Sequence, residues 1–281
     1  MMPEHAWADP PPDRPAPDRP SLAAVMVTRV SPQDRATCGD RVAVETPVAL
    51  AYNCQSHVVM MASPRDLTDF AYGFSIAEGI VASRDEILSV ETAPRGAGIR
   101  LSITIPEPRA RALAARPRNM EGRTGCGLCG IADIAQALRP LPIAATAGRL
   151  PAATLIAALA ALPETQALNR ETGAMHAAAF AAPDGRLVCV REDVGRHNAL
   201  DKVIGAVARQ GLDPAGGFVV VTSRCSMEMV QKTATFGCPV LVAISAPTSL
   251  AIELAEQSNL TVAAFARGAR LNLYTHPERI V

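Results

Sequence analysis

Two cysteines separated by two residues, Cys126 and Cys129, are the strongest candidates for chemistry in this sequence. The short spacing brings both sulfurs to one end of a tight turn, and the glycine after each cysteine leaves the thiols uncrowded. Arg123 lies just upstream, and a helix is expected just downstream, over 131–138. Because a positive charge and a helix N-terminus both stabilise a thiolate, the pair is a candidate reactive sulfur centre.

Three activities fit such a pair: zinc binding, thiol–disulfide exchange, and transport of sulfane sulfur as a persulfide. A zinc site needs four ligands, and the sequence has no second Cys or His pair at short spacing. The His-x-Glu pattern of zinc deaminases occurs only at His276, far downstream of the cysteines. Exchange and persulfide transport both begin with attack of a thiolate on sulfur. From the residues alone these two activities rank about equal, and zinc binding ranks third.

Composition limits the classes of function. Lysine plus arginine is 27 and aspartate plus glutamate is 27, so the net charge of zero argues against broad binding to nucleic acid or to an acidic membrane. The longest alanine- and leucine-rich run, over 153–162, is too short to span a bilayer. The first 20 residues contain seven prolines and no apolar secretory segment. The seven cysteines are an odd number in a chain long enough to fold without disulfides, which is typical of the cytoplasm.

The pattern along the chain predicts an α/β protein in four parts. Residues 1–21 form a disordered proline-rich tail, 22–115 a smaller N-terminal α+β part, 116–130 a mobile loop that carries the cysteine pair, and 131–281 an α/β domain. From residue 175 onward, short valine-rich strands alternate with helices, which predicts a parallel sheet covered on both faces. Strands are expected over 42–45, 48–51, 57–62, 99–105, 177–181, 187–191, 218–222, 240–244, 260–265 and 271–274. Helices are expected over 65–81, 131–138, 151–162, 197–209, 227–236 and 249–258. In the first helix, Ser63 is expected to be the cap and Pro64 the first helical residue.

Ligands of parallel sheets collect at the carboxyl ends of the strands, and three predicted strand ends here carry small polar or basic residues. The segments 223–226 and 245–249 lead directly into helix N-termini, which favour anions. The segment 266–270 supplies Arg267 and Arg270, whose guanidinium groups match phosphate geometry. Together these ends could hold a phosphate-bearing ligand. The alternative is that the serines and threonine before the two helices only cap them.

A dense polar run over 192–202 follows a strand and enters a helix. His197, Asp201 and Lys202 could meet a ligand from one helical turn. The alternative is a solvated, salt-bridged helix start with Asp193 near the cap, and the residues leave both interpretations open. A lone histidine that precedes an apolar strand, His176, is typical of a structural hydrogen-bonding group.

Taken together, the motifs make the chain similar to the FdhD family of formate dehydrogenase accessory sulfurtransferases. The resemblance covers nearly all of the chain after the tail, and it is the combination of blocks that is specific. The blocks are Glu45-Thr46-Pro47, Ser63-Pro64-Arg65-Asp66, Gly73-Phe74, Glu78-Gly79-Ile80, Cys126-Gly127-Leu128-Cys129-Gly130, Thr172-Gly173, His176-Ala177-Ala178, 192–199 with Asp201-Lys202, Ser245-Ala246-Pro247-Thr248-Ser249 and Phe265-Ala266-Arg267.

The resemblance implies a three-layer α/β/α domain like that of cytidine deaminases, but without a catalytic metal, behind a smaller N-terminal α+β part. It implies a sulfurtransferase that takes persulfide sulfur from a cysteine desulfurase, with Cys126 as the carrier and Cys129 as its assistant. The acceptor would be the molybdenum or tungsten cofactor in its Mo-bis(molybdopterin guanine dinucleotide) form, before insertion into the formate dehydrogenase catalytic subunit. Members of the family are cytoplasmic homodimers.

The cofactor-binding stretch of the family falls on Phe265, Ala266, Arg267, Gly268, Ala269 and Arg270, which includes the third strand end described above. A guanine nucleotide is therefore expected to mimic the cofactor. Met175 departs from the pattern, because a smaller polar residue is expected before the histidine. Two alternative functions remain: a non-catalytic chaperone or adaptor for the dehydrogenase, and a thiol–disulfide oxidoreductase.

Overall fold

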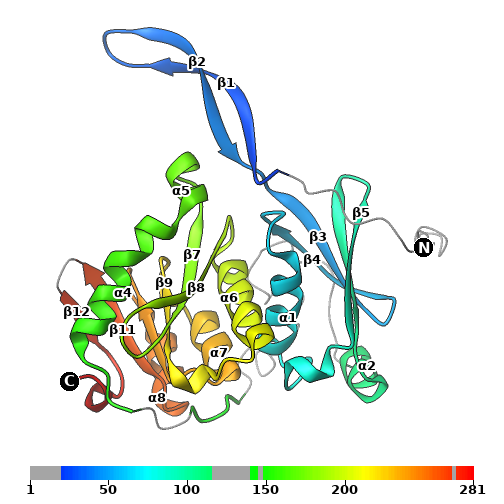
Figure 1. Cartoon of the computed structure of the whole chain (residues 1–281), viewed down its shortest axis with the longest axis vertical. Coiled ribbons are helices and arrows are strands. Elements are labelled where there is room, and N and C mark those ends of the chain that lie inside the picture. The colour runs from blue at the N-terminus through cyan, green and yellow to red at the C-terminus, as the bar shows by residue number, and fades with distance from the viewer. Residues whose placement is uncertain (1–19, 116–139, 145–147, 268–269) are drawn as a thin grey trace.

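The computed structural model describes residues 20–115, 140–144, 148–267 and 270–281, which form three β-sheets with helices packed between and around them (Figure 1). The cysteine pair, its loop, the helix expected over 131–138 and the first 19 residues lie outside the described residues.

The first sheet is a two-stranded antiparallel hairpin that projects from the body of the molecule (Figure 1). Its strands are β1 (Leu22–Val30) and β2 (Arg35–Ala43). In the turn between them, the Ser31 hydroxyl accepts a hydrogen bond of 3.0 Å from the Asp34 N–H. The strand expected over 42–45 is therefore wrong in extent, because its first two residues end a much longer polar strand.

The second sheet has four strands in the order β4-β3-β6-β5, with β3 and β6 parallel and the outer pairs antiparallel. These strands are β3 (Thr46–Tyr52), β4 (Gln55–Ala62), β5 (Ser89–Arg95) and β6 (Gly98–Thr104). Helix α1 (Leu67–Ala77) packs Phe70 and Phe74 into a core that includes Leu50 and Leu101. The helix α2 (Glu107–Ala114) and the 3-10 turn η2 (Arg84–Glu86) complete this part.

Helix α1 begins later than predicted. Its N-cap is Asp66, which has a left-handed backbone with φ of 54° and no side-chain cap, so Ser63 and Pro64 lie outside the helix. Ser63 is instead fully buried, where its N–H donates to Asp193 Oδ2 at 2.9 Å. A tertiary contact thus overrides the local capping preference of the serine.

The third sheet has six strands in the order β12-β11-β10-β9-β7-β8. They are β7 (His176–Ala181), β8 (Leu187–Asp193), β9 (Phe218–Val221), β10 (Val240–Ala243), β11 (Thr261–Arg267) and β12 (Arg270–Leu273). The central strands β9, β10 and β11 are parallel, whereas the β7–β8, β7–β9 and β11–β12 pairs are antiparallel. The parallel sheet predicted from the sequence is therefore confirmed for β9, β10 and β11 but wrong at both sides. Only a few residues separate β7 from β8 and β11 from β12, and so short a connection permits only antiparallel neighbours.

Helices cover both faces of this sheet. The helices and 3-10 turns of this part are α4 (Ala152–Thr165), α5 (Ala167–Thr172), α6 (Arg196–Gln210), α7 (Met227–Phe236), α8 (Ser249–Gln257), η3 (Pro214–Gly216) and η4 (Pro277–Arg279). One face of the sheet packs against α6, α7 and α8 through Ile204, Met229 and Leu254. The other face packs against α4 through Leu155 and Leu162. The α/β fold with three layers, helices–sheet–helices, is confirmed. Among the helices described, none has the length and apolarity needed to cross a bilayer.

Helix α1, which packs on the four-stranded sheet, crosses α6, which packs on the six-stranded sheet, at two glycines. A Cβ atom on Gly73 would lie 1.6 Å from the carbonyl oxygen of Asp201, and one on Gly205 would lie 1.8 Å from that of Asp69. Only glycine permits backbones this close. One continuous hydrophobic core therefore runs through the predicted N-terminal part and the α/β domain.

Candidate functional site at the sheet edge

One edge of the six-stranded sheet collects the ends of five strands. Strands β9, β10 and β11 run parallel and end at this edge, followed by α7 and α8 after the first two. Strand β7 runs the opposite way and begins here at His176, whose neighbour Ala177 accepts a hydrogen bond from the Thr222 N–H at 3.0 Å. Strand β8 ends here at Asp193, opposite His176, and leads into α6. We call this region the sheet-edge site and define it as His176, the first turn of α6 and the segments 222–226, 245–249 and 265–267.

The structure brings the three predicted strand ends together. The Cys225 N–H donates to the Ala246 carbonyl at 3.1 Å, and the Thr248 N–H donates back to the Cys225 carbonyl at 3.0 Å. The Phe265 N–H donates to the Ser245 carbonyl at 3.2 Å. The loops before α7 and α8 are therefore joined to each other and to the end of β11.

The two predicted caps behave differently. Thr248 caps α8, because its hydroxyl accepts a hydrogen bond from the Ala251 N–H at 3.3 Å. Ser226 occupies the N-cap position of α7 but makes no side-chain cap. Its hydroxyl oxygen is buried and has no hydrogen-bond partner within the part of the chain that the structure describes. The capping interpretation is thus confirmed for Thr248 and wrong for Ser226.

The N-terminus of α6 adds a cation to the same edge. Its N-cap is Gly195, which has no side chain, so the helix start has no side-chain cap. The Nε atom of the next residue, Arg196, is buried and has no partner among the described residues. Arg196 belongs to the polar run noted in the sequence but was given no role there, although a basic residue at a predicted helix start was a usable signal.

His176 lies half-buried beside this arginine. Burial is the main cause that lowers the pKa of its imidazole, the charge of Arg196 lowers it further, and Asp193 acts in the opposite direction. The ring is therefore neutral at neutral pH, so it can accept or donate a hydrogen bond without adding a charge.

The polar run over 192–202 forms buried internal pairs. Lys202 Nζ lies 2.6 Å from Asp193 Oδ2 and donates to the Ser63 carbonyl at 3.0 Å. Asp201 accepts bonds of 2.9 and 3.0 Å from Lys232, which also contacts Glu78. The prediction that this run forms salt bridges is confirmed. The prediction that it is exposed to solvent is wrong, because α1 and α7 pack over these side chains and bury them. The structure engages Asp201 and Lys202 internally and also buries His197.

The predicted cofactor stretch forms the end of β11 and the start of β12. Phe265 has a left-handed backbone with φ of 53° and a side chain that is 42% exposed, and the register between β11 and β12 shifts just after Ala264. Ala266 and Arg267 belong to β11, and Arg270 begins β12 with an exposed side chain. Gly268 and Ala269 lie outside the described residues, as do Cys126 and Cys129. Within the described ranges, no three His, Cys, Asp or Glu side chains converge as the ligands of a metal would.

Three other thiols are unsuited to sulfur chemistry. Cys189, Cys225 and Cys238 are buried, and burial raises their pKa values to about 11, 12 and 12. Such thiols stay protonated at neutral pH and are poor nucleophiles. Of the described cysteines, Cys54 is exposed and Cys38 is partly exposed.

The chain is similar to known proteins over most of its length. The model of the FdhD/NarQ family matches residues 43–281. The sulfur carrier protein FdhD of Bordetella petrii is 48% identical over 268 residues, which cover 95% of this chain and 96% of that protein. The protein of the same name from Agrobacterium fabrum is 50% identical over 238 residues, which cover 84% and 88%. A crystal structure from Desulfotalea psychrophila, described as a formate dehydrogenase accessory protein, has a TM-score of 0.74 and 28% identity, with 93% of this chain and 100% of that chain covered. This chain belongs to the FdhD/NarQ family.

Proposed function

We propose that this chain is a sulfur carrier that serves formate dehydrogenase. It takes persulfide sulfur from a cysteine desulfurase on Cys126 and delivers it to the Mo-bis(molybdopterin guanine dinucleotide) cofactor before that cofactor enters the enzyme. The names of the relatives support sulfur carriage. The cytoplasmic location and the homodimer expected from the sequence are part of the proposal.

One observation supports the nucleotide-bearing cofactor as the acceptor of the sulfur. The N-termini of α6, α7 and α8 converge on one edge of the sheet, together with the buried Ser226 hydroxyl and the buried Nε of Arg196, neither of which has a hydrogen-bond partner among the described residues. Helix N-termini and guanidinium groups bind phosphate, and a nucleotide-bearing cofactor carries the phosphates that such a site needs. The predicted cofactor stretch begins at the same edge with Phe265 and would hold the remainder of the ligand.

The sulfur chemistry uses the two cysteines in sequence. The Cys126 thiolate attacks the terminal sulfur of the desulfurase persulfide. The S–S bond of the donor breaks, the desulfurase thiolate leaves, and a persulfide forms on Cys126 without net oxidation. Attack of Cys129 on the inner sulfur of this persulfide then forms the Cys126–Cys129 disulfide and releases HS⁻, so two thiols are oxidised while one sulfane sulfur is reduced to sulfide. A cellular dithiol reductant restores the pair.

Nucleotide binding tests the acceptor half of the proposal. A guanine nucleotide titrated into the full-length protein by calorimetry should bind, and Arg196→Gln and Ser226→Ala should each weaken binding about tenfold, which corresponds to the loss of one good polar contact. Arg111→Gln is the matched control, because this arginine is exposed on α2 and forms an exposed ion pair with Glu107. Affinities that are equal in all four proteins would remove the sheet-edge site from the proposal.

Activation of the dehydrogenase tests the carrier half. A variant with both Cys126→Ser and Cys129→Ser should fail to activate a formate dehydrogenase made in cells that lack the native protein. Full activation would instead support the adaptor alternative. A Cys126–Cys129 disulfide that cycles without any bound sulfane sulfur would support the oxidoreductase alternative.

A further inference from the structure

His176 occupies the start of β7, where the six-stranded sheet meets the N-terminus of α6. It lies opposite Asp193, the last residue of β8, in the antiparallel pair of these strands. Ala178, two residues further along β7, packs in the core on the α6 side of the sheet. Because alternate residues of a strand share a face, His176 lies on the face that α6 covers. The residue is half-buried, so a ligand in the sheet-edge site can contact it.

The carboxylate beside this histidine is already bound by other groups. Asp193 is the described carboxylate whose charge acts on His176. Its hydrogen-bond donors are the N–H groups of Ser63 and Gly195, the Nδ2 of Asn198 and the Nζ of Lys202. The charge of Asp193 is offset by the buried ammonium group of Lys202, which lies 2.6 Å away. Asp193 is therefore a weak counter-ion for a protonated His176.

Arg196 gives the other charge beside the ring. Burial lowers the pKa of His176 most, and the positive charge of Arg196 lowers it further. A phosphate group that binds at the N-terminus of α6 would offset the charge of Arg196 and would also place negative charge beside the ring. Both effects favour the imidazolium form of His176.

The other charged groups of β8 are engaged away from His176. Arg191 pairs with Asp69 of α1 at 2.7 Å. Glu192 accepts hydrogen bonds of 2.9 and 2.8 Å from two N–H groups of α5. On α6, the titratable residue that follows Arg196 is His197, which is buried.

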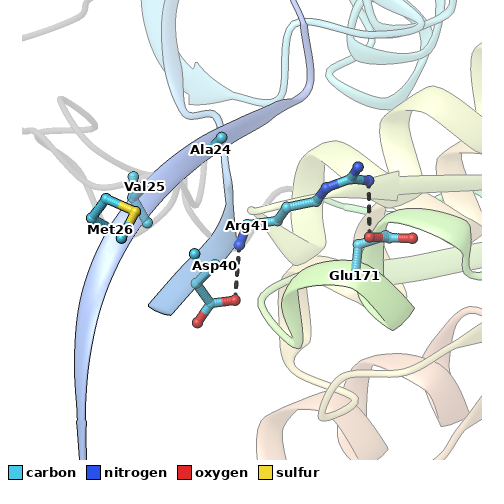
Figure 2. Close-up of a pocket in the computed structure, with 7 residues that line it drawn as sticks. Ala24, Val25, Met26, Asp40, Arg41 and Glu171 are labelled. Carbon is cyan, nitrogen blue, oxygen red and sulfur yellow. Dashed lines mark hydrogen bonds and ion pairs between the residues drawn. The ribbon is translucent and has the colours of Figure 1, made fainter. Parts of the chain in front are cut away.

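The elements on either side of β7 add no charge that acts on His176. On α5, the helix before β7, Glu171 pairs with Arg41 of β2 at 3.0 Å, and both residues line a groove of about 510 Å³ at the base of the β1–β2 hairpin (Figure 2). The end of β9 presents the neutral Thr222 to β7, and Arg224 beyond it is exposed. The protonation of His176 is therefore governed by the charges on α6 and at the end of β8, and by what binds beside them.

We infer that His176 takes up a proton from solvent when the phosphates of the cofactor bind, and that the resulting imidazolium contacts them together with Arg196. Two cations then face the pyrophosphate of a guanine nucleotide, whose two diester phosphates carry one negative charge each. The inference rests on the proposed function, because it concerns the ligand of the sheet-edge site. It makes His176 a binding residue instead of the structural hydrogen-bonding group expected from the sequence.

Proton uptake during nucleotide binding tests the inference. The probe is a guanosine diphosphate sugar, because its pyrophosphate is a diester and lacks the terminal phosphate whose second pKa is about 6. Calorimetric titration of the full-length protein in two buffers of different ionisation enthalpy gives the number of protons taken up per ligand bound. At about pH 7 the wild type should take up about half a proton or more, and it should bind about five- to tenfold more tightly at pH 6 than at pH 8.

One variant removes the proton acceptor and another serves as its control. His176→Gln keeps a neutral hydrogen-bonding side chain, so it should bind the probe without proton uptake and with the same affinity at both pH values. His276→Gln is the matched control, because this histidine lies at the opposite edge of the sheet, where the hydroxyl of Thr261 at the start of β11 donates to its carbonyl at 3.2 Å. It should show the proton uptake of the wild type.

Nuclear magnetic resonance of the wild type gives a readout that depends on no variant. The imidazole Cε1–H resonance of His176, assigned by triple-resonance methods, should titrate about one pH unit higher or more when the probe is bound. Binding without proton uptake, or a His176 pKa that is unchanged in the complex, would overturn the inference and leave the proposed function intact. A wild type that fails to bind the probe at any pH would overturn the inference together with the choice of acceptor.

Discussion

Lys202 and Asp193 form an ion pair of 2.6 Å in which both side chains are completely buried. The backbone of Ser63 completes the cluster, since its carbonyl accepts from Lys202 and its N–H donates to Asp193. The pair thus joins the segment after β4 to the start of α6, and it connects the part with the four-stranded sheet to the part that carries the candidate site.

Removal of one charge from this pair should be strongly destabilising. Lys202→Met leaves Asp193 buried without its cation, and we expect a loss of about 3–5 kcal/mol in the free energy of unfolding, measured by urea denaturation. The double variant Asp193→Asn with Lys202→Met should lose less than the single one, because no unpaired charge remains. Arg111→Met, which breaks an exposed pair, should cost below about 0.5 kcal/mol. A Lys202→Met variant as stable as that control would contradict the structural role of the pair.

The crossing of α1 over α6 predicts a sharp intolerance at one glycine. Gly73→Ala places a Cβ atom 1.6 Å from the Asp201 carbonyl oxygen, so the helices must move apart. We expect a loss of about 3 kcal/mol or more, seen as a lower melting temperature in calorimetry. Gly148→Ala is the control, since a Cβ atom there meets no atom of the described residues within 4 Å. Equal melting temperatures for the two variants would rule out this close packing.

Thiol reactivity should follow burial. At neutral pH, iodoacetamide should modify Cys54 readily but leave Cys189, Cys225 and Cys238 unmodified until urea unfolds the protein, because burial raises the pKa values of these three thiols to about 11, 12 and 12. Peptide mass mapping at several times after addition measures the rates. Modification of Cys225 in the folded protein at the rate of Cys54 would show that the sheet edge is more open than described.

His176 should make the folded state sensitive to acid. Its pKa is lowered from 6.5 in the folded protein, mainly by burial, so the unfolded chain takes up the proton first as the pH falls. This contribution to stability is present above about pH 6.5 and is lost as the pH falls through the folded pKa. The variant His176→Gln should therefore lose less unfolding free energy than the wild type between about pH 7 and pH 5. An identical decline in the two proteins would mean that His176 is not protected from protonation.

The α/β half of the fold is largely predictable from sequence. The range predicted for α7, 227–236, is the observed one, and the apolar run of β9 differs from its prediction by one residue. The hairpin of β1 and β2 could not be predicted from local sequence patterns, because β2 mixes arginine, threonine, glycine and aspartate and has no apolar run. Its pairing depends on register with β1, which no local pattern encodes.

The candidate site was predictable in place but not in detail. Alternation of strands and helices located the polar strand ends that the structure brings together. The contacts that a single side chain makes depend on residues distant in the sequence. The ammonium group of Lys202, for example, donates a hydrogen bond to a carbonyl 139 residues away. The same holds for Ser226 and Thr248, which occupy the same cap position on neighbouring helices, although only Thr248 caps its helix.

The intact mass of the protein after incubation with a cysteine desulfurase and cysteine tests the central claim most directly. The wild type should gain the mass of one sulfur atom, which a thiol reductant removes. Cys129→Ala should retain this added sulfur for longer, because the step that releases HS⁻ is lost, and Cys126→Ala should gain none. A Cys126→Ala protein that carries as much reducible sulfur as the wild type would contradict the account.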